Sequence, residues 1–241
     1  MDSELIGHCA EIERCNQRGS RMLSFTDLVE AGTLTVDWAA YSLAAIGAGA
    51  SFMVGASPGE AGKTTVMCAL LGFVPAGVRL VAAADEAAIE DGLAERRERR
   101  CYICHEIGPG CYYAYLWGAP LRRYFQLPAA GHMLATNLHA DTIEQAREQV
   151  CEINAVPSEE FRRMNILFFL AVEHAGGRTV RRIEQVWESD GRAEHRLLRA
   201  PSDSALVTGA ALGKASRIVA DIVASGARRI GQVRAMLLAR R

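Results

Sequence analysis

A short loop of small residues, residues 57–65, constrains this sequence more than any other feature. Its sequence is SPGEAGKTT, and it lies between a buried segment (residues 51–54) and a segment with helical spacing (64–71). In such a strand–loop–helix unit, the backbone N–H groups of the tight turn point at a bound anion, and the positive end of the helix dipole adds to the attraction. The unit therefore predicts an α/β fold with an anion site after its first strand.

The loop follows the pattern G-x-x-x-x-G-K-[ST], with Ser57 in place of the first glycine. In this pattern the lysine reaches the β- and γ-phosphates of a nucleotide, and the next hydroxyl holds Mg²⁺. We therefore expect ATP and Mg²⁺ as ligands, rather than a glycine-rich connection without a ligand. The predicted nucleotide-binding residues are Ser57, Pro58, Gly59, Glu60, Ala61, Gly62, Lys63, Thr64 and Thr65. Glu60 places a negative charge near the polyphosphate unless its side chain points outward.

Helical and strand-like segments alternate along the chain, which favours a mostly parallel sheet flanked by helices. Predicted strands cover residues 51–54, 78–81, 101–107, 132–136 and 166–174. The alternation over 178–187 predicts a half-exposed antiparallel strand, so we expect the sheet to include some antiparallel edge strands. Predicted helices cover 36–46, 64–71 and 89–100, and two more follow residue 202, broken at Gly226. We expect a helical lead-in over residues 1–35, an α/β core over 36–200, and a C-terminal helical segment of the same domain over 201–241.

Composition and charge exclude several classes of protein. A formal net charge of −1 offers no basic surface for nucleic acid, so we expect no nucleic-acid partner. The first residues lack the positive-then-apolar order of a signal peptide, so we expect a cytoplasmic protein whose seven cysteines are reduced. Residues 38–59 carry no charge over a length close to a bilayer span, about 20 residues. Glycines and a proline interrupt them, which predicts a helix and a buried strand instead.

Several separated segments resemble the secretion ATPases of type II and type IV systems, a family that includes the motors of pili and archaeal flagella. Residues 23–58 are similar to the family's approach to its phosphate loop, and GHMLATNLHAD (131–141) resembles its histidine box. Residues 153–157 and 176–188 are similar to segments of archaeal members. The resemblance implies a RecA-like P-loop NTPase fold. It also implies a hexameric ring at the inner face of the membrane that hydrolyses ATP to move a polytopic membrane platform protein.

The resemblance also assigns roles to single residues. VRLVAAAD corresponds to the acidic box, with Asp85 as its carboxylate, and YICHEI corresponds to the Walker B strand. Glu106 is then the catalytic carboxylate and, with Thr64, helps to hold Mg²⁺. His132 and His139 correspond to the two histidines of the box and are expected to contact the γ-phosphate side of the site or relay its state. Lys63 completes the predicted catalytic set.

An arginine from a neighbouring subunit can raise the rate of phosphoryl transfer by orders of magnitude. The candidates for such a residue are Arg178, Arg181 and Arg182. Two departures from the family pattern, Ala84 and Gly108, leave open a regulatory or assembly subunit that binds nucleotide with weak or no hydrolysis. A P-loop enzyme that phosphorylates a small molecule is a further alternative.

Two other patterns have competing interpretations. CYICH (101–105) matches the haem-attachment spacing, and with Cys111 it could form a Cys₃His zinc site. Cys101, Cys104 and His105 would be its other ligands, whereas cysteines on a buried strand are more often part of the core. The aromatic segment 111–125 predicts core packing or a subunit interface, in preference to a base-stacking platform or a membrane contact.

Overall fold

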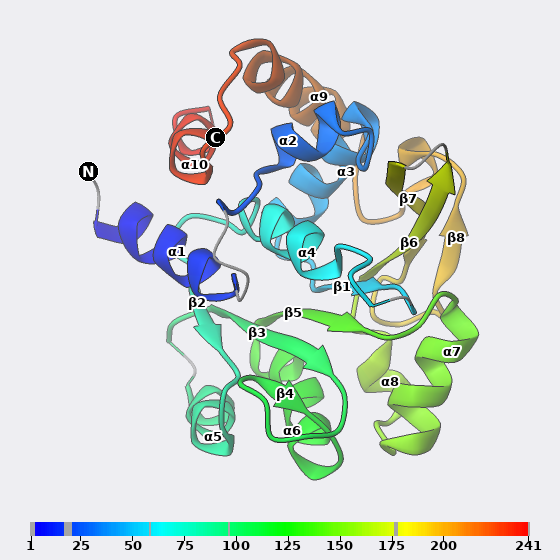
Figure 1. The fold of residues 1–241 in the computed structure, drawn as a ribbon. Coiled ribbons are helices and arrows are strands. Elements are labelled where there is room, and N and C mark those ends of the chain that lie inside the picture. The colour runs from blue at the N-terminus through cyan, green and yellow to red at the C-terminus, as the bar shows by residue number, and fades with distance from the viewer. Residues whose placement is uncertain (1–2, 17–20, 58, 96, 176–177, 241) are drawn as a thin grey trace.

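A computed structural model describes residues 3–16, 21–57, 59–95, 97–175 and 178–240 of the chain. These residues form one eight-stranded mixed sheet with helices on both faces (Figure 1). The strand order is β2-β3-β5-β1-β6-β7-β8, and β4 pairs with β3 beside this path. The α/β architecture with a mostly parallel, helix-flanked sheet is the one that the sequence predicts.

The parallel strands form the centre of the sheet and one of its edges. They are β1 (Phe52–Gly55), β2 (Arg79–Ala82), β3 (Arg100–Ile107), β4 (Tyr115–Leu116), β5 (Met133–Leu138) and β6 (Ile166–Ala175). At the other edge, β7 (Arg178–Glu188) and β8 (Arg196–Leu198) run antiparallel. β1 lies between β5 and β6, and all four of its residues are buried, as expected for a central parallel strand covered on both faces.

One face of the sheet carries the helices that surround α4. They are α1 (Ser3–Arg14), α2 (Phe25–Glu30), α3 (Val36–Gly47), α4 (Lys63–Leu71), α9 (Gly209–Ala224) and α10 (Ile230–Leu238). The N-terminal and C-terminal helices join one hydrophobic core, which includes Ile12 of α1, Phe25 of α2 and Leu237 of α10. This shared core explains why α1 and α10 lie side by side in Figure 1.

The opposite face carries a second core of aromatic and aliphatic side chains. Its helices are α5 (Glu86–Ala94), α6 (Ala119–Gln126), α7 (Ile143–Arg147) and α8 (Ser158–Phe161), with short helical turns η1 (Leu127–Ala130) and η2 (Glu148–Ile153). A further turn, η3 (Pro201–Asp203), follows β8. In the aromatic segment 111–125, Leu121, Tyr124 and Phe125 are fully buried here, whereas Tyr112 and Tyr113 are exposed. The packing role expected for this segment therefore holds for its second half.

The predicted helix over residues 89–100 is wrong at its C-terminal end. Helix α5 ends at Ala94, and Arg100 already belongs to β3, where it pairs in register with Arg79 of β2. The many charged residues of this segment favour a solvated surface, but this does not hold for all of them. Arg100 is buried, and its guanidinium donates to Asp91 and Glu98. These bonds compensate the cost of burying its charge. Arg100 is therefore the first residue of a buried strand although it belongs to a highly charged segment of the sequence.

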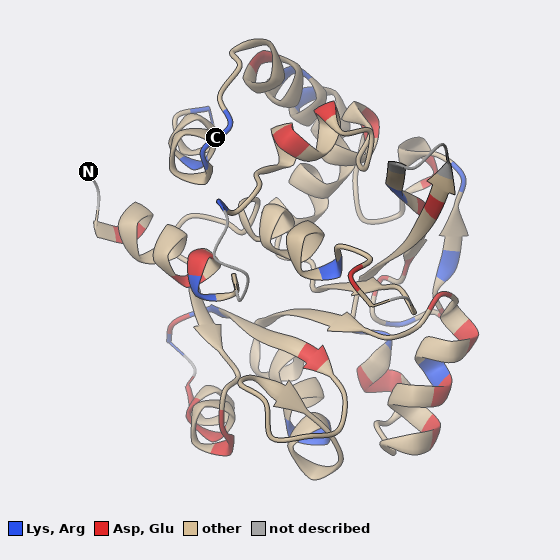
Figure 2. Cartoon of the chain, in the orientation of Figure 1, with Lys and Arg blue, Asp and Glu red and all other residues tan. Residues whose placement is uncertain are grey.

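Charged side chains of both signs are interspersed over the helices and loops in the view of Figure 2. None of the helices in the described residues combines the length and the apolar character that crossing a membrane requires. The uncharged stretch before residue 59 forms α3 and β1, as the interrupting glycines predict.

Candidate functional site

The loop after β1 forms the rim of the candidate site and leads directly into α4. Gly62, the N-cap of α4, has φ of 92°, and Glu60 has φ of 65°. Both values lie in the left-handed region, which costs a non-glycine residue free energy. A Cβ atom on Gly62 would also lie 3.1 Å from Cδ of Arg181. Glycine is therefore required at position 62 both by the backbone conformation and by the close approach of the Arg181 side chain.

Lys63 is the first residue of α4 and turns back under the loop. Its side chain is buried, and its Nζ donates to the carbonyl of Ala56 at 3.1 Å. Nζ also lies 3.7 Å from Oε2 of Glu106. Burial lowers the pKa of Lys63, and the carboxylate of Glu106 opposes this shift. The ammonium group thus lies between the loop and a buried carboxylate.

Glu106 comes from the C-terminal end of β3, which is not a direct neighbour of β1, because β5 lies between them. The pairing of β3 with β5 is irregular between Cys104 and Ile107, at the position of this residue. Burial raises the pKa of Glu106, while Lys63 and His139 act to lower it. Among the residues that the structure describes, its Oε1 has no hydrogen-bond partner. A buried acceptor of this kind is suited to a bound water, ion or substrate.

His139 follows the end of β5 and reaches the same cluster. Its Nδ1 lies 3.1 Å from Nζ of Lys63 and 3.2 Å from the carbonyl oxygen of Ser57. Its Nε2 lies 3.8 Å from Oε2 of Glu106. The side chain is half exposed, so the imidazole closes the cluster on its solvent side. The structure therefore brings together Lys63, Glu106 and His139 from three separate segments.

Asn137 is a residue of this cluster that the sequence analysis missed. It is fully buried at the end of β5, and its Nδ2 donates to the carbonyl of His105 at 2.8 Å and lies 3.4 Å from Oγ1 of Thr64. Its Oδ1 has no partner within the described part of the chain. A polar residue at the end of a buried strand was the available signal, the same one that marks Glu106.

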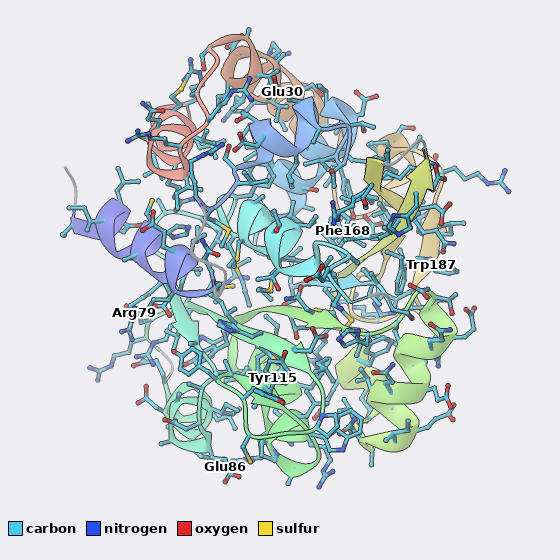
Figure 3. The ribbon with its side chains drawn as sticks, viewed as in Figure 1. Glu30, Arg79, Glu86, Tyr115, Phe168 and Trp187 are labelled. Carbon is cyan, nitrogen blue, oxygen red and sulfur yellow. The ribbon has the colours of Figure 1, made fainter. Side chains whose placement is uncertain are left out.

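A cavity of about 810 Å³ opens in front of this cluster. The loop and the side chains of Lys63, Glu106 and His139 form part of its lining. Much of the remaining lining, which is of mixed polar and apolar character, comes from the N-terminal lead-in, a segment for which no part in the site was predicted. The lining from this segment comprises Cys15, Asn16, Arg21, Met22, Leu23, Leu28, Ala31 and Thr33. Tyr115 of β4, labelled in Figure 3, adds an aromatic ring to the lining.

Two predicted site residues do not join this cluster. His132 lies just before β5, at the opposite end of the strand from His139, where its Nδ1 accepts from the backbone N–H of Arg100 and its Nε2 lies 2.8 Å from the carbonyl oxygen of Gly92. The prediction that His132 contacts the γ-phosphate side is therefore not supported, and its bonds give it a structural role. Asp85 is exposed, does not line the cavity, and caps α5 by accepting from the N–H of Ala88.

Most, but not all, of the predicted loop residues line the cavity. Gly59, Glu60, Ala61, Gly62, Lys63, Thr64 and Thr65 all line the cavity. The backbone N–H of Ser57 is already used, since it donates to Oδ1 of Asp141 at 2.6 Å. Pro58 lies outside the described residues.

The cysteine pattern at 101–105 belongs to the core. Cys101 packs in the core on the α4 side of the sheet, and Cys104 packs in the core on the opposite side. Burial raises the pKa of both thiols, that of Cys104 to about 12, so neither is a ready thiolate ligand. No group of three or more His, Cys, Asp or Glu residues in the described ranges is placed to hold a metal ion. The zinc interpretation is therefore not supported.

The three candidate arginines of the 178–187 segment differ in whether they reach the cavity. Arg181 lines the cavity, and its guanidinium donates to the carbonyl of Glu60. Arg182 is exposed and pairs with Glu173 instead. The side chain of Arg178 lies outside the described residues.

Comparison with models of known protein families gives no match for this sequence. A comparison with curated proteins gives no match either.

Proposed function

We propose that this chain is a RecA-like P-loop ATPase that binds Mg-ATP in the cavity above α4. The observation that carries the proposal is the convergence of Lys63, Thr64, Glu106 and His139 around a glycine-containing loop that follows a central parallel strand. In open α/β sheets, ligands bind beyond the carboxyl ends of the strands, where this cluster lies.

The chemistry of the cluster suits phosphoryl transfer. The loop backbone and the N-terminus of α4 would hold the phosphates, and the ammonium group of Lys63 would neutralise part of their charge. The hydroxyl of Thr64 and the carboxylate of Glu106 face one cavity and fit Mg²⁺, which binds one or two protein oxygens and keeps several waters. Bound Mg²⁺ would offset charge on the β- and γ-phosphates.

Glu106 is also the residue best suited to orient the attacking water. Its unpartnered Oε1 can accept a hydrogen bond from water and so hold that water in position for attack. The half-exposed imidazole of His139, 3.8 Å from this carboxylate, would contact the γ-phosphate side. Apolar residues of the cavity lining, such as Met22, Leu23 and Leu28, suit the base of the nucleotide.

We further propose that the ATPase is the motor domain of a secretion or type IV pilus-like system, working at the inner face of the membrane. This part of the proposal rests on the resemblance of residues 23–58 and 131–141 to the family described above. The same resemblance supports a ring of six subunits that moves a polytopic membrane platform protein.

Phosphate release from Mg-ATP tests the proposed activity. The wild-type chain should release phosphate, Lys63→Ala should lose nucleotide binding or turnover, and Glu106→Gln should bind nucleotide without turnover. His132→Gln is a matched control, since this histidine lies outside the cavity and should not affect release per folded molecule. Unchanged phosphate release in both Lys63→Ala and Glu106→Gln would contradict the assignment. Tight binding without turnover by the wild type, even at concentrations where it assembles, would favour a regulatory or assembly subunit.

A further inference from the structure

Arg181 of β7 lies against the strained part of the glycine loop. Its Nε and Nη2 donate to the carbonyl oxygen of Glu60 at 3.3 and 3.2 Å. Glu60 is the non-glycine residue with φ of 65°, and Gly62 approaches the Arg181 side chain so closely that a Cβ there would lie 3.1 Å from Cδ. One side chain from a distant strand therefore contacts the loop at two positions.

In the part of the chain that the structure describes, no carboxylate pairs with Arg181. Of the described residues, three lysine or arginine side chains line the cavity: Arg21, Lys63 and Arg181. Arg21 forms a two-bond pair with Asp27, at 2.9 and 2.8 Å, and Lys63 faces Glu106 at 3.7 Å. Within the described residues, Arg181 forms no ion pair and donates only to a backbone carbonyl. Its positive charge is thus the one that remains available to an anionic ligand.

The guanidinium also keeps hydrogen-bonding capacity. Its two bonds to Glu60 use Nε and Nη2, and arginine carries further N–H donors on Nη1, for which the described residues offer no acceptor. Arginine donors in a fixed fork match the geometry of phosphate oxygens, and such charge-assisted bonds are about twice as strong as neutral ones.

We propose that Arg181 is a second cation of the phosphate site, supplied by the same chain. It holds the loop through the Glu60 carbonyl with one edge of its guanidinium and binds a polyphosphate oxygen of the nucleotide with its remaining donors. This inference rests on the proposed binding of Mg-ATP in the cavity. It differs from the expectation of an arginine from a neighbouring subunit, because no second copy is needed to bring Arg181 to the loop.

Arg182 provides a matched control for this role. It is the next residue of β7, so its side chain leaves the opposite face of the strand. It is exposed and pairs with Glu173 of β6, away from the cavity. Arg181→Gln and Arg182→Gln therefore remove the same charge from adjacent positions, but only the first affects the loop.

Competition with a fluorescent ATP analogue, using Mg-ATP and adenosine as the competing ligands, tests the inference. Arg181→Gln should weaken Mg-ATP about 10- to 100-fold, the range for losing charged hydrogen bonds. It should leave adenosine binding unchanged, because adenosine lacks phosphates. Arg181→Lys should recover part of the loss through its charge, and Arg182→Gln should change affinity by less than about twofold.

Three results would overturn the inference. Wild-type affinity for Mg-ATP in Arg181→Gln would show that the arginine does not bind the nucleotide. Equal losses of Mg-ATP and adenosine binding would show that Arg181 only supports the fold of the site. Thermal melting of the variant would reveal such a fold defect. If the wild-type chain binds no Mg-ATP, the proposed function fails and the role of Arg181 fails with it. A failure of Arg181→Gln alone leaves the proposed function intact.

Discussion

Replacing Glu106 with glutamine is expected to stabilise the protein at mildly alkaline pH while removing the proposed hydrolysis of ATP. Burial raises the pKa of this carboxyl above its usual range, and Oε1 has no partner among the described residues. A group whose pKa is raised in the folded state stabilises the fold at acid pH and loses this contribution as pH rises through the folded pKa. At about pH 8 the ionised carboxylate therefore costs stability that a neutral amide avoids.

The magnitude follows from the environment of the carboxylate. Burying an ionised carboxylate costs several kcal/mol, and glutamine avoids this cost although its amide oxygen remains a buried acceptor. In wild type, the ammonium group of Lys63, 3.7 Å away, offsets part of this cost. We therefore expect Glu106→Gln to raise the free energy of unfolding by about 1 kcal/mol. In a chain of this length the gain corresponds to a rise in Tm of about 2–4 °C. It should shrink towards about pH 3, below the unfolded pKa of about 4.3, where the wild-type carboxyl is protonated in both the folded and unfolded states.

Thermal melts followed by circular dichroism across this pH range provide the assay. Glu90→Gln is the matched control, because Glu90 is exposed and its hydrogen bonds with Arg123 lower its pKa, the opposite direction. This control should be neutral or slightly destabilising. A Glu106→Gln variant that is less stable than wild type at about pH 8, or whose gain is equal at every pH, would refute the reasoning.

Three further predictions concern single residues near or outside the site. Glu60→Gly should be more stable than Glu60→Ala by about 1 kcal/mol in thermal melts, because both remove the charge but only glycine accepts a positive φ without strain; equal stability would contradict this. His132→Ala should lower the free energy of unfolding by about 2 kcal/mol through its lost backbone hydrogen bonds, measured in urea, with nucleotide affinity unchanged. Asp85→Ala should cost about 1 kcal/mol as a lost helix cap, and a large loss of nucleotide affinity would instead return Asp85 to the site.

The central strand–loop–helix unit and the parallel sheet could be predicted from the sequence because their signals are local. The loop pattern covers a continuous stretch, and β1 and α4 lie within about a residue of the expected segments. Glu106 was predicted from its position at a strand end together with the family resemblance, and it does lie beside Lys63. The fold class therefore follows from patterns that short windows of sequence contain.

The two histidines show where resemblance to a motif is insufficient. His132 and His139 flank β5, a strand of six residues, and such a strand spans about 20 Å. Only His139, after the strand, reaches the cluster, while His132 lies beyond the N-terminal end of β5. Similarity in sequence matched both residues to one box, but strand geometry separates them.

The remaining parts of the site depend on long-range pairing that the sequence does not reveal. Alternation along a strand predicts that Arg181 and Arg182 face opposite sides, but it does not say which side meets the loop. The register of β6 with β7, which shifts between Phe169 and Leu170, decides this. The lead-in residues Met22 and Leu23 likewise reach the cavity only because the N-terminal segment folds back over α4.

Calorimetric titration of the purified chain with a non-hydrolysable Mg-ATP analogue measures nucleotide binding without requiring turnover. We expect a single saturable site in the wild-type chain, and loss of that site in Lys63→Ala at unchanged folded content, because Lys63 provides the ammonium group beneath the loop. Absence of binding by the wild type, or equal affinity in Lys63→Ala, would contradict the proposed binding of Mg-ATP.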